Sequence, residues 1–191
     1  MKKTCIGLFF LICGALNGHD CFLEGKIGYF LPTNNRFQKI YPGGPIYGLE
    51  FDYQIWNPIY SWIEIDYFTK TGRTEESGDH TQIQLVQLSL GFQWIYNQHW
   101  IQPYIGAGPQ ATYLNSHVDS EFLIRKESKW GIGALFKTGF VAKISKAFLI
   151  DLFTNYSWQT MDMHRPHQKK LVTHKANVSG FSFGGGIRYR F

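Results

Sequence analysis

Acidic and basic side chains recur on one face of several alternating segments, and these are the residues best suited to chemistry. Side chains two positions apart on a strand share a face, so Glu50 lies beside Asp52, and Glu64 beside Asp66. Such pairs of carboxylates can serve acid–base catalysis or line an ion path. The polar faces carry Glu24, Glu50, Asp52, Glu64, Asp66 and Asp151, together with Lys26, Lys70, Lys137, Arg188 and Arg190.

We favour a structural role for these charges, namely a charge-balanced plug. If the alternating segments are eight strands that close into a barrel, the interior has only enough room for side chains to fill it. Charges in so narrow a space need partners, because an unpaired buried ion is costly. Arg188 and Lys137 are therefore expected to lie near carboxylates of neighbouring strands, such as Asp151 or Glu24. The predicted interior charges are Lys26, Glu50, Asp52, Glu64, Asp66, Lys137, Asp151, Arg188 and Arg190.

Other residue patterns that could support chemistry are incomplete. The histidines at 164, 167 and 174, near Lys169 and Lys170, could bind a metal or anionic lipopolysaccharide, but no cysteine joins them and we predict no metal site. The glycines at 106, 108, 131, 133, 139, 180, 184 and 186 occur at strand spacing without the Lys-Ser/Thr of a phosphate loop. Ser116-His117 and His80-Thr81 show no companion acid at a readable spacing. We therefore predict no catalytic residues and no cofactor.

The elements that must position these residues are β-strands. Apolar and polar residues alternate with a period of two, which predicts strands with two unlike faces. The clearest case is the segment from Tyr47 to Ile55, where tyrosine, leucine, phenylalanine and isoleucine oppose glycine, glutamate, aspartate and glutamine. Eight segments show the pattern: residues 23–31, 47–55, 63–70, 86–94, 101–111, 130–142, 148–158 and 180–191.

The chemistry of the two faces distinguishes a membrane barrel from a soluble β-sandwich. One face is apolar with Tyr and Trp near the strand ends, and the other combines Gly, Ser, Gln and charges. This inside-out arrangement is typical of transmembrane barrels, in which closure also satisfies every strand hydrogen bond. A mean hydropathy of −0.21 argues against a bundle of membrane helices. The predicted fold is an all-β, eight-stranded, antiparallel up-and-down transmembrane barrel.

The predicted connections alternate between long and short. Long loops are expected at residues 33–44, 72–80, 115–129 and 160–176, and tight turns at 57–58, 97–99 and 144–146. Outer-membrane barrels have short periplasmic turns and longer extracellular loops, so both termini should be periplasmic. Proline cannot donate to a strand ladder, and we therefore expect a bulge or local break at Pro103 or Pro109.

The first residues have the pattern of a secretory signal peptide. Lys2 and Lys3 precede an apolar stretch from Cys5 to Leu16, and small residues follow. The predicted organisation is a signal peptide over residues 1–18 and a barrel over residues 19–191. Removal of the signal would leave Cys21 as the last cysteine, so no disulfide is predicted. The net charge of +5 includes the two signal lysines and gives no support to nucleic-acid binding.

The last segment, Gly186-Ile187-Arg188-Tyr189-Arg190-Phe191, resembles the C-terminal assembly signal of bacterial outer-membrane proteins, with Gly186, Tyr189 and Phe191 as its characteristic residues. Pro103-Tyr104-Ile105-Gly106-Ala107-Gly108 resembles a strand of the small OmpA/OmpX/opacity-type barrels. Strand number and loop plan extend this resemblance over the chain from residue 19. It implies insertion in the outer membrane by the barrel assembly machinery, among outer-membrane lipids. The lipid A deacylases of similar barrels use a His-x-Ser pair, which is absent from this sequence.

The predicted function is therefore a structural or adhesion-like surface role, with host or surface ligands contacting the four long loops. We do not expect an enzyme. The alternatives are a lipid-modifying enzyme, which would need a Ser or His for lipid turnover, and a narrow channel, which would conduct in planar bilayers.

Overall fold

The computed structural model describes residues 20–73, 80–96, 100–120, 123–167 and 170–191. The predicted signal peptide and its boundary lie outside these residues. Within them, the only helix is short, and no helix is long and apolar enough to cross a membrane. The elements in chain order are β1 (Cys21–Pro32), α2 (Asn35–Ile40), β2 (Gly44–Trp56), β3 (Ile59–Arg73), β4 (His80–Ile95), β5 (Ile101–Ser120), β6 (Leu123–Lys143), β7 (Phe148–His167), β8 (Lys170–Asn177) and β9 (Gly180–Arg190).

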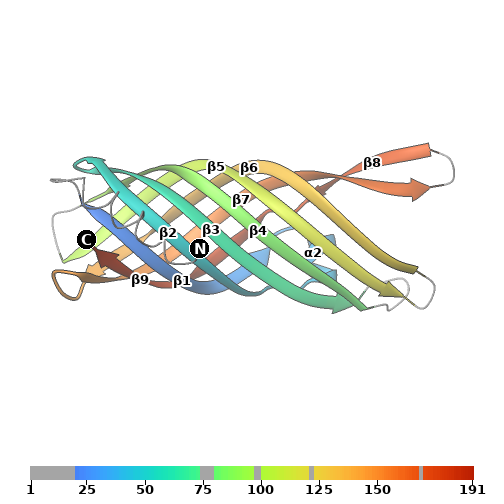
Figure 1. Ribbon diagram of the computed structural model, residues 1–191, viewed down its shortest axis with the longest axis horizontal. Coiled ribbons are helices and arrows are strands. Elements are labelled where there is room, and N and C mark those ends of the chain that lie inside the picture. Colours follow the sequence, from blue (N-terminus) through green and yellow to red (C-terminus); the bar gives the residue numbers. More distant parts are fainter. Residues whose placement is uncertain (1–19, 74–79, 97–99, 121–122, 168–169) are drawn as a thin grey trace, which may run out of the picture.

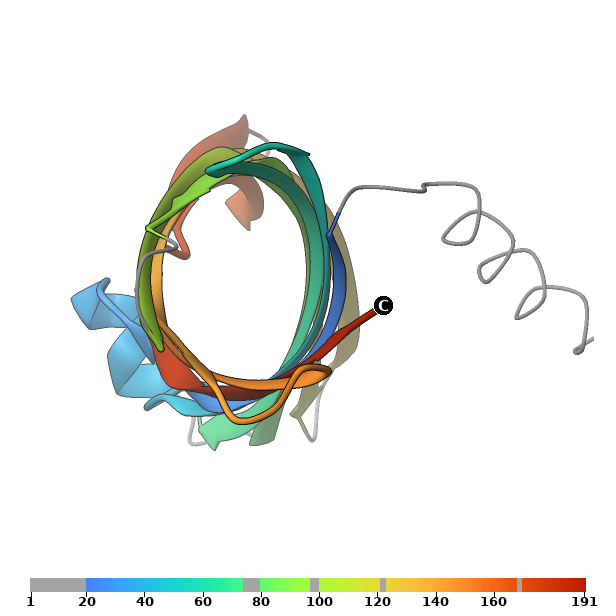
Figure 2. The same ribbon diagram turned by 90° about the vertical axis from the view of Figure 1, so that its left-hand side faces the viewer.

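The strands form one antiparallel sheet that closes on itself (Figures 1 and 2). Each of β1 to β7 pairs with the next strand in the chain, and β9 lies between β7 and β1. β8 continues the line of β9 and pairs with β7. Because β8 and β9 together supply one wall position, the barrel is a closed, up-and-down barrel of eight strands, as predicted.

The interruption between β8 and β9 falls at Val178 and Ser179. Here side-chain oxygens accept some of the hydrogen bonds that backbone carbonyls accept in a continuous ladder. The backbone N–H of Gln159 donates to the Ser179 hydroxyl at 2.8 Å, and the backbone N–H of Ser179 donates to Asn177 Oδ1 at 2.8 Å. The backbone polar groups are thus satisfied although the strand bends.

The two faces of the wall have the predicted inside-out composition. Large apolar side chains are exposed on the outer surface, with Ile132 82% and Trp130 72% exposed. Charged and amide side chains are buried inside, where Glu24 and Asp52 have no exposed surface. A soluble domain rarely exposes so continuous an apolar surface.

The two ends of the barrel differ. At the turn end, Asn57 and Pro58 connect β2 to β3 and residues 144–147 connect β6 to β7, as predicted. At the hairpin end, the strands continue into segments that the sequence suggested were loops. Residues 115–129 are largely paired strand of β5 and β6, and 160–176 are largely paired strand of β7 and β8.

The other long connections differ as well. The segment 33–44 contains helix α2, whose Phe37 and Ile40 pack on the barrel's apolar interior. Most of 72–80 and the turn 97–99 lie outside the described residues. Strand pairing extends well beyond the predicted strand ends, so the long loops predicted at 115–129 and 160–176 are hairpins instead, and the predicted alternation of loop lengths is not reproduced there.

Pairing of β5 is interrupted at only one of its two prolines, Pro109, and on one side only. β5 pairs with β6 without a break, but its ladder to β4 lapses between the pairs Ser89–Gln110 and Phe92–Ala107, with no change of register. Pro109, which has no amide hydrogen, lies in this gap. The predicted local break is therefore present, and no bulge accompanies it.

Gly91 and Gly108 allow the two strands to approach closely across the gap. A Cβ on Gly108 would lie 1.9 Å from the Leu90 carbonyl oxygen and 2.7 Å from the Gly91 Cα. Both are backbone atoms, so a side chain at Gly108 would push β4 away from β5. The two glycines therefore allow β4 and β5 to pack closely at the point where the ladder between these strands lapses.

We predict that Gly108→Ala lowers the free energy of unfolding by about 1 to 3 kcal/mol, the usual cost of overpacking. The measurement is urea unfolding in detergent micelles. Gly25→Ala is the matched control, because a Cβ on Gly25 meets no atom within 4 Å. Equal effects of the two substitutions would show that the close approach is unimportant.

Candidate functional site

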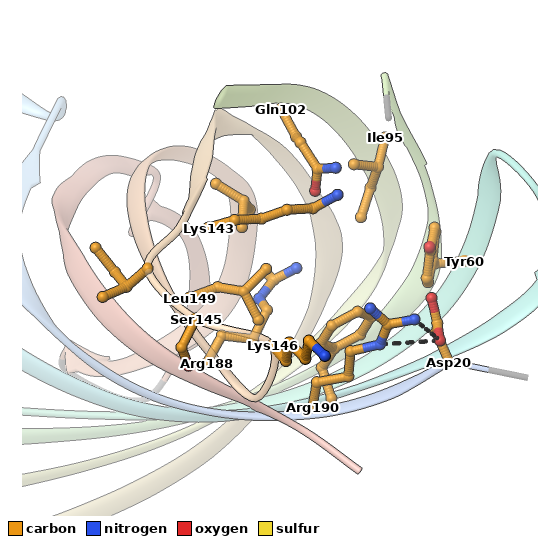
Figure 3. A pocket seen from close by; sticks show the side chains of 13 residues that line it. Asp20, Tyr60, Ile95, Gln102, Lys143, Ser145, Lys146, Leu149, Arg188 and Arg190 are labelled. Atoms are coloured by element: carbon orange, nitrogen blue, oxygen red, sulfur yellow. Dashed lines mark hydrogen bonds and ion pairs between the residues drawn. The ribbon is translucent and has the colours of Figure 1, made fainter. Parts of the chain in front are cut away.

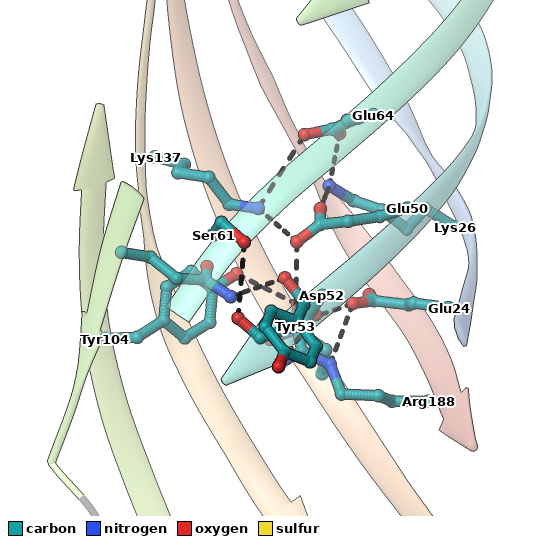
Figure 4. A network of polar contacts seen from close by, with 12 residues as sticks. Glu24, Lys26, Glu50, Asp52, Tyr53, Ser61, Glu64, Tyr104, Lys137 and Arg188 are labelled. Atoms are coloured by element: carbon teal, nitrogen blue, oxygen red, sulfur yellow. Dashed lines mark hydrogen bonds and ion pairs between the residues drawn. The ribbon is translucent and has the colours of Figure 1, made fainter. Parts of the chain in front are cut away.

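The candidate site is a cluster of nine charged side chains in the barrel interior, which we call the central network (Figure 4). Each member occupies an inward position of its strand and is at most 7% exposed. Eight of the nine predicted interior charges belong to it, and Glu24 completes it. The members are Glu24 and Lys26 of β1, Glu50 and Asp52 of β2, Glu64 and Asp66 of β3, Lys137 of β6, Asp151 of β7 and Arg188 of β9.

Two lysines and two glutamates form one half of the network. The Lys26 ammonium lies 2.9 Å from Glu50 Oε2 and also binds Glu64. Lys137 binds Glu50, and its Nζ lies 3.7 Å from Glu64 Oε2. β6 has β5 and β7 as its sheet neighbours, so Lys137 reaches across the interior to strands on the other side. The prediction that partners lie on adjacent strands is thus wrong for Lys137.

Arg188 organises the other half. Its Nε and Nη2 donate to Glu24 Oε2 at 3.0 and 2.7 Å, and its Nη1 lies 3.3 Å from Asp52 Oδ2. Its Nη2 also lies 3.6 Å from Asp151 Oδ2. The predicted neighbours of Arg188, Glu24 and Asp151, are therefore both present.

Neutral side chains hold the carboxylates in place. The Tyr104 hydroxyl donates to Asp151 Oδ2 at 2.9 Å, and the Gln93 amide donates to Asp52 Oδ1 at 2.6 Å. Aromatic rings support the lysines: the Lys137 ammonium lies 4.6 Å from the centre of the Trp62 ring, a cation–π distance. These contacts fix the positions of charges that solvent does not reach.

Apolar clusters lie on both sides of the central network along the strands. On β1, Phe22 precedes Glu24 and Lys26, and Phe30 follows them; on β3, Tyr60 precedes and Phe68 follows the acids. The turn-end cluster comprises Phe22, Tyr60, Ile95, Tyr104, Val141, Leu149 and Phe153. The hairpin-end cluster comprises Phe30, Tyr41, Ile46, Phe68, Ile83, Leu85, Leu114, Met161 and Val178.

The charges inside are not balanced, in contrast to the sequence-based expectation. The central network holds six carboxyl groups and three basic groups. Lys70, which we placed on the polar face, lies beside Gly44 toward the hairpin end. Arg190, a predicted interior charge, lies at the mouth of the turn end, where its side chain is 42% exposed and pairs with Asp20 at 2.5 Å.

A pocket of about 490 Å³ opens at this mouth (Figure 3). Lys143, Lys146 and Arg190 line its rim, while Phe22 and Leu149 of the turn-end cluster line its inner wall. Arg188 of the central network also lines the pocket, so the pocket extends from the mouth to the edge of that network.

Three carboxyl groups of the network, those of Glu24, Glu50 and Asp52, have oxygens within 4.8 Å of one another and could in principle share a metal ion. The same carboxyl groups already contact Arg188, Lys26 and Lys137. Their arrangement therefore suits ion pairs with these basic groups.

The histidines at 164, 167 and 174 lie on β7 and β8, and the structure does not describe their side chains.

The sequence analysis missed the inward apolar and neutral residues that surround the charges. Side chains two positions apart on a strand share a face. Trp62 is therefore on the same face as Glu64, Tyr60 on the same face as Trp62, and Phe153 on the same face as Asp151, so all of them point inward. Position along the strand, rather than residue type, was the signal that could have revealed them.

The residues of the predicted assembly signal have two different environments. A Cβ on Gly186 would lie 2.1 Å from Glu24 Oε1, so this glycine leaves room for the partner of Arg188. Tyr189 and Phe191 lie outside the barrel at the turn end, with their rings 5.0 Å apart and edge to face. Tyr189 also packs against Phe148 at 5.2 Å. The glycine therefore serves the interior, and the aromatic residues form an outer cluster.

Comparison with solved structures places the fold. The Escherichia coli outer membrane protein W is 18% identical with a TM-score of 0.58, and the match covers 90% of this chain and 97% of that one. A major outer membrane protein of Thermus thermophilus is 11% identical with a TM-score of 0.60, covering 92% of this chain and all of that one.

The Yersinia pestis attachment invasion locus protein Ail, solved with the heparin analogue sucrose octasulfate, is 15% identical with a TM-score of 0.56 and coverage of 92% and 100%. No known family matches the sequence, and neither does any curated protein. The chain nevertheless has the fold of the small eight-stranded outer-membrane β-barrels, as its sequence resemblance predicted.

Proposed function

We propose that this protein is an integral outer-membrane barrel that acts at the cell surface through its hairpin end. The apolar outer face and the fold support membrane insertion. The periplasm would then hold the turn end and both termini, because the longer connections and extensions of outer-membrane barrels are typical of the extracellular side, and here the hairpin end carries them. Its role is structural and interactive rather than enzymatic, and its interior is plugged by the central network and the two apolar clusters.

The surface role is supported by the length of the strands, which extend far at the hairpin end. Strands β5, β6 and β7 are 20, 21 and 20 residues long, about twice the length needed to cross a membrane. The β6–β7 ladder ends at the Ile132–Thr160 pair, so the wall divides above it into a β5–β6 hairpin and a β7–β8 hairpin. The second hairpin projects from the barrel in Figure 1.

Charge favours an anionic partner for the β7–β8 hairpin. Residues 161–177 contain Arg165, Lys169, Lys170 and Lys175 against one acid, Asp162. The opposite hairpin, residues 115–129, carries equal numbers of acidic and basic residues. The similar barrel Ail was solved with a sulfated heparin analogue. We therefore propose a sulfated or phosphorylated polysaccharide as the partner.

The test is binding of heparin to intact cells that display the protein. Replacing residues 163–174 with Asn-Gly, a dipeptide suited to tight hairpins, joins the paired residues Asp162 and Lys175. It removes three positive charges, each contributing about 0.5 kcal/mol to binding, and should weaken binding about tenfold. Binding should also fall with added salt.

The matched control shortens the other hairpin. Replacing residues 118–125 with Asn-Gly joins the paired His117 and Lys126 and removes two acids and one base. This variant should bind heparin as well as the full chain does. Unchanged binding after the 163–174 replacement, or absence of binding by intact cells expressing the folded full chain, would contradict the proposal.

A further inference from the structure

The pocket at the turn end has no part in the proposed surface role. It opens at the end of the barrel opposite to the β5–β6 and β7–β8 hairpins, and we call it the mouth pocket (Figure 3). Its volume of about 490 Å³ is in the range of pockets that hold small molecules. Arg188 and side chains of the turn-end cluster form its inner end, so a ligand must enter from the mouth.

The rim of the mouth pocket carries an excess of positive charge. Lys143 is the last residue of β6, Lys146 lies in the turn to β7, and Arg190 is the last residue of β9. Asp20 is the only acid among the described residues that line the pocket, and it pairs with Arg190. Lys143 and Lys146 are both exposed, so the rim presents two further positive charges to a ligand. An anion is therefore attracted to the mouth.

The inner wall of the mouth pocket is mostly apolar. Five residues of the turn-end cluster line it, and they come from β1, β3, β4, β6 and β7. These residues are Phe22, Tyr60, Ile95, Val141 and Leu149. Each methylene group buried against such a wall strengthens binding by about fourfold. The wall therefore favours a ligand with a hydrocarbon part in addition to the negative charge that the rim attracts.

Charge determines which end of such a ligand enters first. At the inner end, Arg188 already donates two hydrogen bonds to Glu24, and the centre of the Phe22 ring lies 5.8 Å from its guanidinium carbon. The central network beyond it holds six carboxyl groups and three basic groups. An anionic head group placed there would face this excess of acids in a region that solvent does not reach, which is costly. The head group therefore stays at the rim, and the hydrocarbon chain points inward.

We propose that the mouth pocket binds a small amphipathic anion with a single short hydrocarbon chain. The chain lies against Phe22, Ile95 and Leu149, and the head group contacts the ammonium groups of Lys143 and Lys146. A medium-chain fatty acid and a phosphate ester of a medium-chain alcohol share this chemistry. Binding requires no opening of the wall, because the pocket is already accessible from the mouth.

The experiment is a titration of the full chain in phosphatidylcholine nanodiscs with octanoate, followed by NMR of isoleucine and leucine methyl groups. The signals of Ile95 and Leu149 should shift and reach saturation. Those of Ile83 and Leu85, in the hairpin-end cluster, should not move. Hexanoate should bind about fifteenfold more weakly, since two methylene groups contribute about fourfold each. Octanamide, which has the same chain and a neutral head group, should bind about fivefold more weakly.

Combining Lys143→Gln with Lys146→Gln tests the rim. This double variant should bind octanoate about fivefold more weakly than the wild type, the effect of losing two exposed ion pairs, and should bind octanamide equally well. The matched control combines Lys39→Gln with Lys129→Gln, which removes two lysines from the hairpin end. It should bind octanoate as the wild type does. Methyl spectra without ligand show that both double variants are folded.

Three results would overturn the proposal. They are equal binding of octanoate and octanamide, equal weakening by the two double variants, and shifts of the Ile83 signal as large as those of Ile95. Octyl phosphate has the same chain as octanoate, so the tighter of the two identifies the ligand as a phosphate ester or a fatty acid. Heparin binding to intact cells should be unchanged in the rim variant, which separates this site from the proposed surface function.

Discussion

Replacing Arg188 with methionine should lower the free energy of unfolding by about 3 to 5 kcal/mol, the cost of breaking a buried ion pair by removing one partner. Arg188 contacts Glu24 and lies within 3.6 Å of Asp52 and Asp151. Methionine fills much of the same volume, so the loss is mainly electrostatic.

Arg190→Met is the matched control, because it removes the same side chain from the same strand at an exposed position. The Arg190–Asp20 pair is half open to water, and such surface pairs contribute about 0 to 1 kcal/mol. Both variants can be compared by urea unfolding in detergent. If Arg188→Met were as stable as the wild type, the central network would not contribute to holding the barrel together.

Replacing Phe68 with alanine should have an effect of similar size for a different reason. Phe68 is 1% exposed, and its ring packs edge-on against Phe30 with centroids 5.1 Å apart. Truncating a buried phenylalanine costs about 3 to 5 kcal/mol, since both its contacts and its volume are lost. The cavity would form in the hairpin-end cluster, next to the central network.

The control for this prediction is Phe92→Ala on the outer face, where the ring is 62% exposed and truncation leaves no internal cavity.

Planar bilayers supply a second measurement. Neither the wild type nor Phe68→Ala should show discrete conductance, because the turn-end cluster remains intact in both. Steady single-channel currents from the wild type would contradict the plugged interior and favour a channel.

The sequence was sufficient to predict the wall of the barrel, because a period of two determines which residues share a face. Lys26, Glu50 and Asp52 all point inward for this reason. The same rule applied to apolar residues would have placed Trp62 and Phe153 inside as well. Those residues were missed because apolar side chains were assumed to face lipid.

Other features depend on the closed structure and could not be read from one strand at a time. The balance of charge depends on how far along the barrel axis each residue lies, and this separates Arg190 and Lys70 from the network. The extension of β5 to β8 into predicted loops depends on cross-strand pairing. The contact of Lys137 with Glu50 depends on the curvature that brings β6 opposite β2.

That cross-lumen contact has a consequence for the kinetics of assembly. Lys137 and Glu50 are 87 residues apart in the chain and lie on strands that are not neighbours in the sheet, so they meet only when the wall has curved around the interior. Interactions formed after the folding transition state slow unfolding without speeding folding. The ion pairs should therefore slow unfolding and leave the rate of closure unchanged, because opening the barrel requires several buried ion pairs to separate together.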